Sequence, residues 1–211
     1  MKAVLSACLL FGLFSPVALL QCYFCPGGLC DTPEIVNCTD DQDACVSAVS
    51  NVKIAESFPG SLIHFKRCGK SEHCLDKRFS MHTGEGGSFR SRRECCSSDG
   101  CNGPLLTLSE PVEDLPNGIL CPSCFSFDFT DSDECSGVEN MVCTGEETRC
   151  VEGTMELKTK HLDDAMYIYF QGCGTPSMCT IKFSVAPISS NETKYTMKRL
   201  RCKNGTEVVT V

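Results

Sequence analysis

Apolar residues in this chain gather in short stretches separated by glycine, proline and polar residues. Residues 44–49 and 62–65 are two such stretches, and the proline-glycine pair between them is typical of a chain reversal. Residues 151–158 and 165–171 repeat this arrangement later in the chain. No segment has the sustained apolar spacing of three and four residues that marks a long amphipathic helix. The pattern predicts an all-β protein made of hairpins.

Two further hairpins are predicted from the same signals. The segment from Cys74 to Cys95 contains a glycine-rich run at residues 83–87, which suits a tight turn. Residues 181–185 and 195–201 flank a polar run that begins with a proline. Each half of the chain is therefore expected to carry two hairpins in the same order.

Cysteine spacing divides the chain into two copies of one unit. From Cys22 to Cys101 the steps are 3, 5, 8, 7, 23, 6, 21, 1 and 5 residues, and from Cys121 to Cys202 they are 3, 11, 8, 7, 23, 6 and 23. Four consecutive steps are identical, which indicates an internal repeat whose two copies begin 99 residues apart, at Cys22 and Cys121. The predicted organisation is a signal peptide at 1–20, a ten-cysteine domain at 21–102, a linker at 103–120 and an eight-cysteine domain at 121–211.

The first residues predict an export signal. Lys2 precedes an uncharged run through residue 20, and small or apolar residues before Gln21 suit cleavage there. A membrane anchor is the alternative because the run approaches the length of a span, but Pro16 interrupts it and cysteines begin at once. Cleavage would leave 18 cysteines in 191 residues, an even number at a density typical of oxidising compartments. We therefore expect a secreted, extracellular protein without a membrane span.

Disulfides must supply much of the stability. The chain has no Trp and only 12 Phe and 4 Tyr, too few large apolar side chains for the cores of two such modules. Each bridge typically contributes about 2–4 kcal/mol. The CxxC pairs Cys22/Cys25 and Cys121/Cys124 are also compatible with zinc or redox chemistry, but both need reduced thiolates. In an exported chain we expect structural disulfides and no metal.

The cysteine motifs resemble those of the Ly-6/urokinase-receptor three-finger superfamily. The resemblance lies in the opening CYFC at Cys22, in the shared intervals, and in the closing Cys95-Cys96, four residues, then Cys101-Asn102. It implies two tandem disulfide-rich three-finger domains, of which the second lacks the last disulfide because no cysteine adjoins Cys202. The implied pairs are Cys22–Cys45, Cys25–Cys30, Cys38–Cys68, Cys74–Cys95, Cys96–Cys101, Cys121–Cys150, Cys124–Cys135, Cys143–Cys173 and Cys179–Cys202.

Within that superfamily the chain resembles the gamma-type phospholipase A2 inhibitors. The similar motifs are the junction LPNG at residues 115–118, the run GEETRC ending at Cys150, and the basic run at residues 89–93. This resemblance implies a circulating protein that binds extracellular phospholipase A2 and blocks it by occlusion. The alternative is a receptor-like or gamete- and epithelium-associated ligand-binding protein of the same superfamily, because a three-finger fold does not fix the partner.

Catalytic motifs are not found in the sequence. His64, His73, His82 and His161 share no metal-ligand spacing and are interpreted as surface residues. There is no nucleophile elbow, HExxH motif or phosphate-binding loop. We therefore predict no enzyme activity, no catalytic residues and no cofactor.

Charge is distributed unevenly along the chain. Residues 103–152 hold eleven acidic residues and one basic residue, whereas residues 153–211 carry a net charge of +3. The acidic stretch is either a solvated face or a surface that attracts a basic protein, and it disfavours nucleic acid. The linker leucines are predicted to pack along a module or at an interface, and homo- or hetero-oligomers are both possible. The predicted partner surface comprises Leu105, Leu106, Leu108, Leu115, Asp128, Asp131, Asp133 and Glu134.

Three sequons predict glycosylation, at Asn191, Asn204 and Asn37. Asn191 lies at a predicted hairpin tip, while Asn37 precedes a cysteine and is the weakest acceptor. The basic runs before the last cysteines of each copy, at residues 90–93 and 198–201, are interpreted as solvated because they are repeated.

Overall fold

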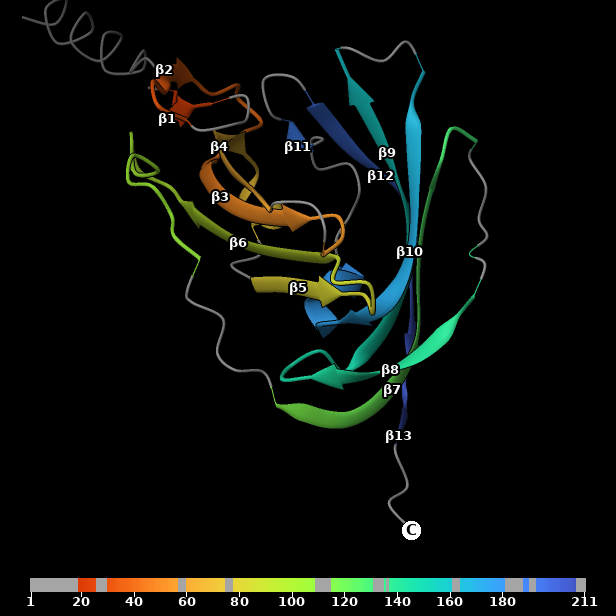
Figure 1. Cartoon of the computed structure of the whole chain (residues 1–211). Helices are drawn as coiled ribbons and strands as arrows, with labels where there is room; N and C mark the ends of the chain where they lie inside the picture. The colour runs from red at the N-terminus through yellow and green to blue at the C-terminus, as the bar shows by residue number, and fades with distance from the viewer. Residues whose placement is uncertain are drawn as a thin grey trace, which may run out of the picture.

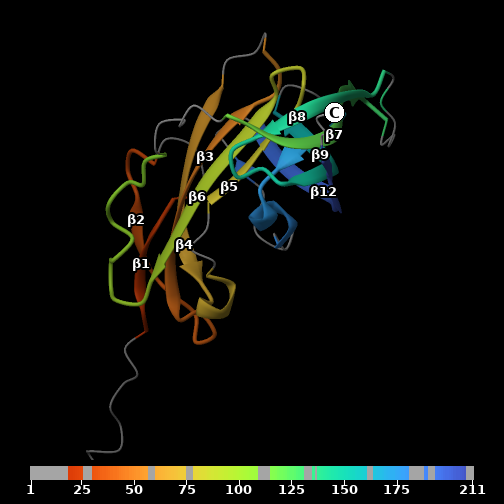
Figure 2. The same ribbon diagram turned by 90° about the horizontal axis from the view of Figure 1, so that it is seen from below.

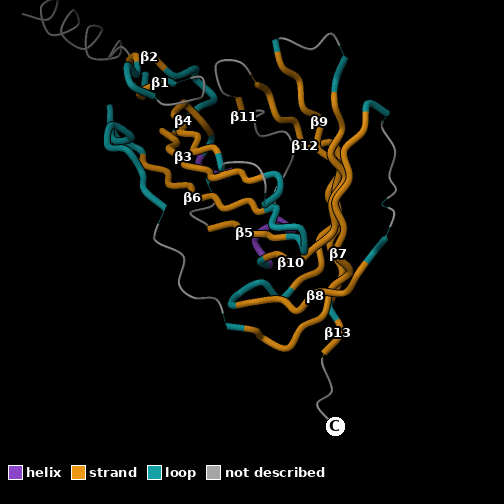
Figure 3. The backbone as a smooth tube through the Cα atoms, in the orientation of Figure 1, coloured by secondary structure: helices purple, strands orange, loops and turns teal. Residues whose placement is uncertain are grey.

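The computed structural model describes residues 19–25, 30–56, 60–74, 78–108, 115–130, 135, 137–160, 164–180, 188–189 and 193–207. Most of the predicted signal peptide, and the residues Asn191, Asp131, Asp133 and Glu134, lie outside these ranges. Within them the regular structure consists of β-strands and two short 3-10 helices (Figure 3), which confirms the all-β prediction. None of the helices in the described ranges is long and apolar enough to span a membrane.

The first module pairs one small sheet with one larger sheet. Strands β1 and β2 form an antiparallel pair, and the larger sheet has the order β4-β3-β6-β5. The glycine-rich run at residues 83–87 connects β5 and β6, as the sequence predicts, and Thr83 N–H donates to the Gly87 carbonyl at 2.9 Å. The elements are β1 (Gln21–Phe24), β2 (Glu34–Asn37), β3 (Ala44–Lys53), β4 (Ser61–Gly69), η1 (Ser71–His73), β5 (Arg78–His82) and β6 (Ser88–Cys96).

The second module joins its strands into one sheet, because its first strand, β7, also pairs with β10. Its strands follow the order β8-β7-β10-β9-β12-β11, and β13 adds to β7. The predicted strand at residues 181–185 lies outside the described residues. The elements are β7 (Pro116–Asp128), β8 (Glu139–Thr144), β9 (Arg149–Thr159), β10 (Met166–Gly174), η2 (Pro176–Thr180), β11 (Ile188–Ser189), β12 (Thr193–Asn204) and β13 (Thr206–Glu207).

The Asn117-Gly118 pair lies within a strand, whereas its sequence is typical of a turn. Gly118 has a φ of +78°, and the register of β7 against β8 shifts between Pro116 and Leu120. The side-chain amide of Asn117 donates to the carbonyls of Gly145 at 3.0 Å and Glu147 at 3.1 Å. The pair therefore forms a β-bulge that fastens the start of β7 to the β8–β9 loop.

The two modules share one continuous sheet. Strand β5 of the first module pairs with β10 of the second through the registers His82↔Cys173 and Met81↔Gly174. Figure 1 shows the two sets of strands as walls that meet at β5 and β10, and Figure 2 shows the same junction from below. The close approach needs a glycine, because a Cβ at Gly172 would overlap the carbonyl oxygen of His82.

The main apolar core lies between the modules. Phe79 and Met81 of β5 are buried against residues of the second module, among them Ile168 and Phe170 of β10. Each module has a second cluster made almost wholly of cystine, around Cys22 in the first and Cys121 in the second. Hydrophobic burial therefore joins the modules, while sulfur fills their individual centres.

Candidate protein-binding surface

Nine disulfides hold the hairpins in place. They have the pairing that the superfamily resemblance implies: Cys22–Cys45, Cys25–Cys30, Cys38–Cys68, Cys74–Cys95, Cys96–Cys101, Cys121–Cys150, Cys124–Cys135, Cys143–Cys173 and Cys179–Cys202. Neighbouring bridges are in contact, with the sulfurs of Cys22 and Cys38 only 3.2 Å apart. These compact sulfur groups have the spacing of a metal site. Their sulfurs are bonded to one another, whereas zinc binds thiolates, so the chemistry is that of a covalent frame.

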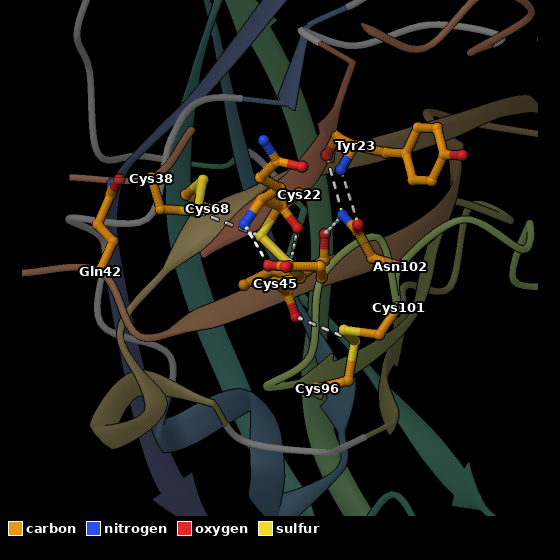
Figure 4. Close-up of a disulfide and its surroundings, with 12 residues drawn as sticks. Cys22, Tyr23, Cys38, Gln42, Cys45, Cys68, Cys96, Cys101 and Asn102 are labelled. Carbon is orange, nitrogen blue, oxygen red and sulfur yellow. Dashed lines mark hydrogen bonds between the residues drawn. A yellow bond between two sulfur atoms is a disulfide. The ribbon is translucent and has the colours of Figure 1, made fainter. Parts of the chain in front are cut away.

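Asn102 closes the first module with its side chain. Its amide nitrogen donates to the carbonyls of Tyr23 at 2.9 Å and Val46 at 3.2 Å, and its oxygen accepts from Tyr23 N–H at 2.9 Å. Figure 4 shows this side chain between β1 and the Cys96–Cys101 bridge. Asn102 is 3% exposed, so the backbone groups that it satisfies are shielded from water.

The third hairpin of the first module, β5–β6, is occupied by the second module. Besides its apolar contacts, Ser80 accepts the Thr175 N–H at 2.9 Å through its carbonyl, and Gly84 N–H donates to the Ser123 hydroxyl at 2.6 Å. The Ser177 hydroxyl donates to the Arg78 carbonyl at 2.6 Å. This hairpin therefore serves the junction and offers little free surface to a partner.

His82 belongs to this junction, although the sequence suggested a surface histidine. Its Nδ1 contacts the buried carboxylate of Glu147, which also accepts the Ser80 hydroxyl at 2.7 Å. Burying a carboxylate is costly unless such partners satisfy it. Sequence reasoning missed the pair because its members lie 65 residues apart.

The predicted partner residues that the structure describes do not form one continuous patch. Leu105 and Leu115 are 54% and 74% exposed, while Leu106 and Leu108 are half-buried. The two exposed leucines therefore do not pack along a module, and their place at an interface stays a prediction. Asp128 lies elsewhere, at the end of β7.

Exposed phenylalanines flank Asp128 in sequence at the end of β7. Phe127 is 58% and Phe129 57% exposed, and the ring of Phe127 lies 6.5 Å from that of Phe125. We call Phe127, Asp128 and Phe129 the β7 fingertip. Residues on opposite strands at matching positions share a face, so Phe127, opposite Ile168, extends the apolar face that the first module covers further down.

The charge at the fingertip is held in place by local hydrogen bonds. The Thr130 hydroxyl donates to Asp128 at 2.8 Å and Phe129 N–H donates at 2.6 Å. The bonds from Thr130 first, then from Phe129, lower the pKa of the Asp128 carboxyl below its usual range. A negative charge is thus fixed at the end of β7, next in sequence to two exposed phenylalanines.

Cysteine spacing could have located this fingertip. The interval from Cys124 to Cys135 is 11 residues, whereas its counterpart from Cys25 to Cys30 is 5. The second module therefore has a longer loop at the end of its first strand, and that loop contains alternating phenylalanines. Asp128 was predicted for its charge, whereas the aromatic residues beside it were not predicted.

The two sequons that the structure describes are exposed. Asn37 accepts a hydrogen bond from the Gln21 side chain at 2.9 Å, and Asn204 accepts one from Arg149. Both bonds use the amide oxygen, whereas a glycan would be attached to the amide nitrogen, so they leave glycosylation open and it stays a prediction.

Comparison with known proteins identifies the repeat. A u-PAR/Ly-6 domain model matches residues 18–104 and again residues 117–206. The chain is similar to the phospholipase A2 inhibitor gamma subunit A1 of Trimerodytes annularis, with 31% identity covering 70% of this chain and 75% of that protein. It is also similar to protein RoBo-1 of Rattus norvegicus, with 27% identity covering 75% of this chain and 61% of that protein. Among solved structures, mouse TEX101 matches 83% of this chain and 88% of its own, with 20% identity and a TM-score of 0.34.

Proposed function

The chain belongs to the u-PAR/Ly-6 family of extracellular and cell-surface binding proteins, and we propose that it inhibits an extracellular phospholipase A2 by occlusion. Members of this family act by binding and are not enzymes. The similarity to a phospholipase A2 inhibitor subunit over most of both chains supports this target. The export signal predicted at the N-terminus favours a secreted form.

The β7 fingertip is the surface that we propose for the enzyme. Exposed aromatic side chains are enriched at the centres of protein interfaces, where they contribute most of the binding energy. A phospholipase must present apolar and basic groups to an anionic membrane. Two exposed phenyl rings and a carboxylate at one strand end are complementary to such a face, and they would compete with the membrane for it.

Direct inhibition assays test the function. Glycosylated protein should inhibit hydrolysis of anionic vesicles by at least one of several basic secreted phospholipases A2, and surface plasmon resonance should detect the complex. Absence of inhibition and binding at micromolar protein across the enzymes would refute the proposed function.

A double variant tests the fingertip separately. Replacing Phe127 and Phe129 by serine should weaken binding at least about tenfold, because truncating central aromatic residues typically costs more than 1 kcal/mol each. The matched control replaces Ile35 and Leu62, which are exposed on the first module to a similar degree (58% and 48%), by serine. Inhibition that survives the double variant but not the control would place the interface on the first module.

A receptor-like ligand-binding role is the second candidate. The similarity to RoBo-1 supports it, because this relative has a longer chain and is not named as a phospholipase A2 inhibitor. Cross-linking on intact epithelial or germ cells, followed by identification of the captured protein, would favour this role if no phospholipase is bound.

A further inference from the structure

Two arginines project from the same face of the first module. Arg93 of β6 lies opposite Ala48 of β3, and Arg67 of β4 lies opposite Val46. Because alternate residues of a strand share a face, all four side chains lie on one side of the sheet. The small side chains of Val46 and Ala48 leave the two long side chains room to approach each other across β3. Phe79, which belongs to the inter-module core, lies on the same face, because it pairs with Ser91 and Ser91 is two residues before Arg93 in β6.

Aromatic rings hold both guanidinium groups. The Arg67 guanidinium lies 5.0 Å from the Phe65 ring centre, and that of Arg93 lies 5.8 Å from the Phe79 ring centre. Stacking on a ring covers the face of a planar guanidinium and leaves its N–H edge free. Arg93 is thus separated from its neighbours Arg90 and Arg92, which strand alternation places on the opposite face.

Neither arginine forms a salt bridge with an acidic residue in the ranges that the structure describes. The Nε atom of each is buried and has no hydrogen-bond acceptor within the described part of the chain. Burial lowers the pKa of both groups, and the charge of Arg67 lowers the pKa of Arg93 further. The two side chains are half-buried, and a cationic pair with buried, unbonded Nε–H groups is unfavourable, because buried polar groups are nearly always hydrogen-bonded and like charges repel.

We propose that Arg67 and Arg93 bind a phosphate or sulfate group between them. Each guanidinium can offer two parallel N–H donors, and a tetrahedral oxyanion has enough oxygens to accept from both forks. Its charge of about −2 would neutralise the pair. A lysine pair would lack this planar geometry, so the choice of arginine at both positions fits oxyanion recognition. The site is separate from the β7 fingertip and does not depend on the proposed phospholipase target.

Two sources can supply this group in extracellular fluid: the free ion, or a sulfate carried by a polysaccharide. Unfolding experiments with inorganic phosphate, inorganic sulfate and a heparin-derived tetrasaccharide distinguish them, with sodium chloride at matched ionic strength as the reference. For a dissociation constant of about 1 mM, about 10 mM anion should raise the thermal unfolding midpoint by about 3–6 °C. A response to the tetrasaccharide alone would assign the group to a glycan.

Variants separate binding from a general salt effect. Arg93→Gln and, independently, Arg67→Gln should abolish the anion-induced shift. Without anion, each should be at least as stable as the natural protein, because a repulsive pair is removed. The matched control is Arg78→Gln, which removes an exposed arginine from the opposite face of the same sheet and should retain the full shift.

Nuclear magnetic resonance gives a second measurement. Titration with phosphate should move the Nε–H resonances of Arg67 and Arg93 with one common saturation curve, and leave that of Arg78 unmoved. Equal stabilisation of the natural protein and both single variants would overturn the proposal. So would the absence of saturable Nε–H shifts with all three anions.

Discussion

The two modules fasten their first strands by different means. In the first module, the Gln21 carbonyl accepts the Gly100 N–H at 2.7 Å, and Gly100 lies in the loop that the Cys96–Cys101 disulfide closes. The side chain of Asn102 binds the backbone of Tyr23 in the same strand as Gln21. The second module has no such loop. At the equivalent position, 99 residues later, Leu120 pairs with Thr206 of β13. A short backbone strand thus replaces a disulfide loop and a buried amide, so the family's last disulfide is one of several ways to close the same fold.

The modules also differ in what their cores require. The buried apolar residues of the second module, such as Val151 and Met178, pack in one cluster with Phe79 and Met81 of the first. Cystine clusters occupy both module centres. The second module therefore depends on its neighbour for hydrophobic burial, and the β5–β6 hairpin is committed to that role.

The largest expected effect follows from removing the Asn102 clamp. Asn102→Ala leaves the Tyr23 N–H and two carbonyls without buried partners, so it should lower the free energy of unfolding by about 3–4 kcal/mol. Urea unfolding measures this loss. The control, Asn140→Ala, removes an exposed asparagine from β8 and should change stability by less than about 0.5 kcal/mol. An equal effect of both would mean that the disulfide loop alone closes the module.

A smaller loss should follow from Gly172→Ala. The added methyl group meets the His82 carbonyl, so β10 and β5 must move apart at a cost of about 2–3 kcal/mol. Hydrogen exchange should accelerate at Thr175 N–H, which bonds across the junction, and not at Gly100 N–H, which bonds within the first module. Unchanged exchange at Thr175 would show that the junction tolerates the methyl group.

Removal of β13 should lower the free energy of unfolding by a smaller amount. Truncation after Asn204 deletes two paired residues of an exposed strand, and we expect a loss of about 1 kcal/mol in urea unfolding. The matching change in the first module is the replacement of both Cys96 and Cys101 by serine. It should lower the free energy of unfolding by about 2 kcal/mol, because the disulfide closes only a short loop. If the truncation lowers stability more than loss of the disulfide does, then β13 closes its module more strongly than the disulfide loop closes the first.

The smallest effect concerns the pH dependence of the β7 fingertip. The carboxyl of Asp128 should titrate below its usual pKa, because Thr130 and Phe129 donate hydrogen bonds to the charged form. The folded pKa is depressed, so the small stabilisation is present above the unfolded pKa and is lost as the pH falls through the folded pKa. Carbon-13 nuclear magnetic resonance titration of the carboxyl measures the pKa of Asp128 in the folded protein. Thr130→Ala should move the pKa back towards its usual range, and an unchanged midpoint would remove the hydrogen bond from the explanation.

Much of the fold could be predicted from local sequence patterns, whereas much of the surface could not. Strand ranges such as 44–49 and 62–65 were predicted as parts of β3 and β4, because alternation and turn residues act over short distances. The role of Asn117-Gly118 was misjudged because the same pair suits a turn or a bulge, and contacts with Gly145 decide between them. The fingertip aromatics were overlooked because exposure depends on which face the first module covers.

By itself the sequence determined that the chain is all-β, duplicated and rich in disulfides, since spacing and periodicity are written along the chain. Only the tertiary structure decided that β5 joins β10, that His82 meets Glu147, and that Arg67 approaches Arg93 across β3. These contacts connect residues that are distant in sequence. Their formation depends on how strands that are distant in sequence pair and pack, which no local pattern encodes.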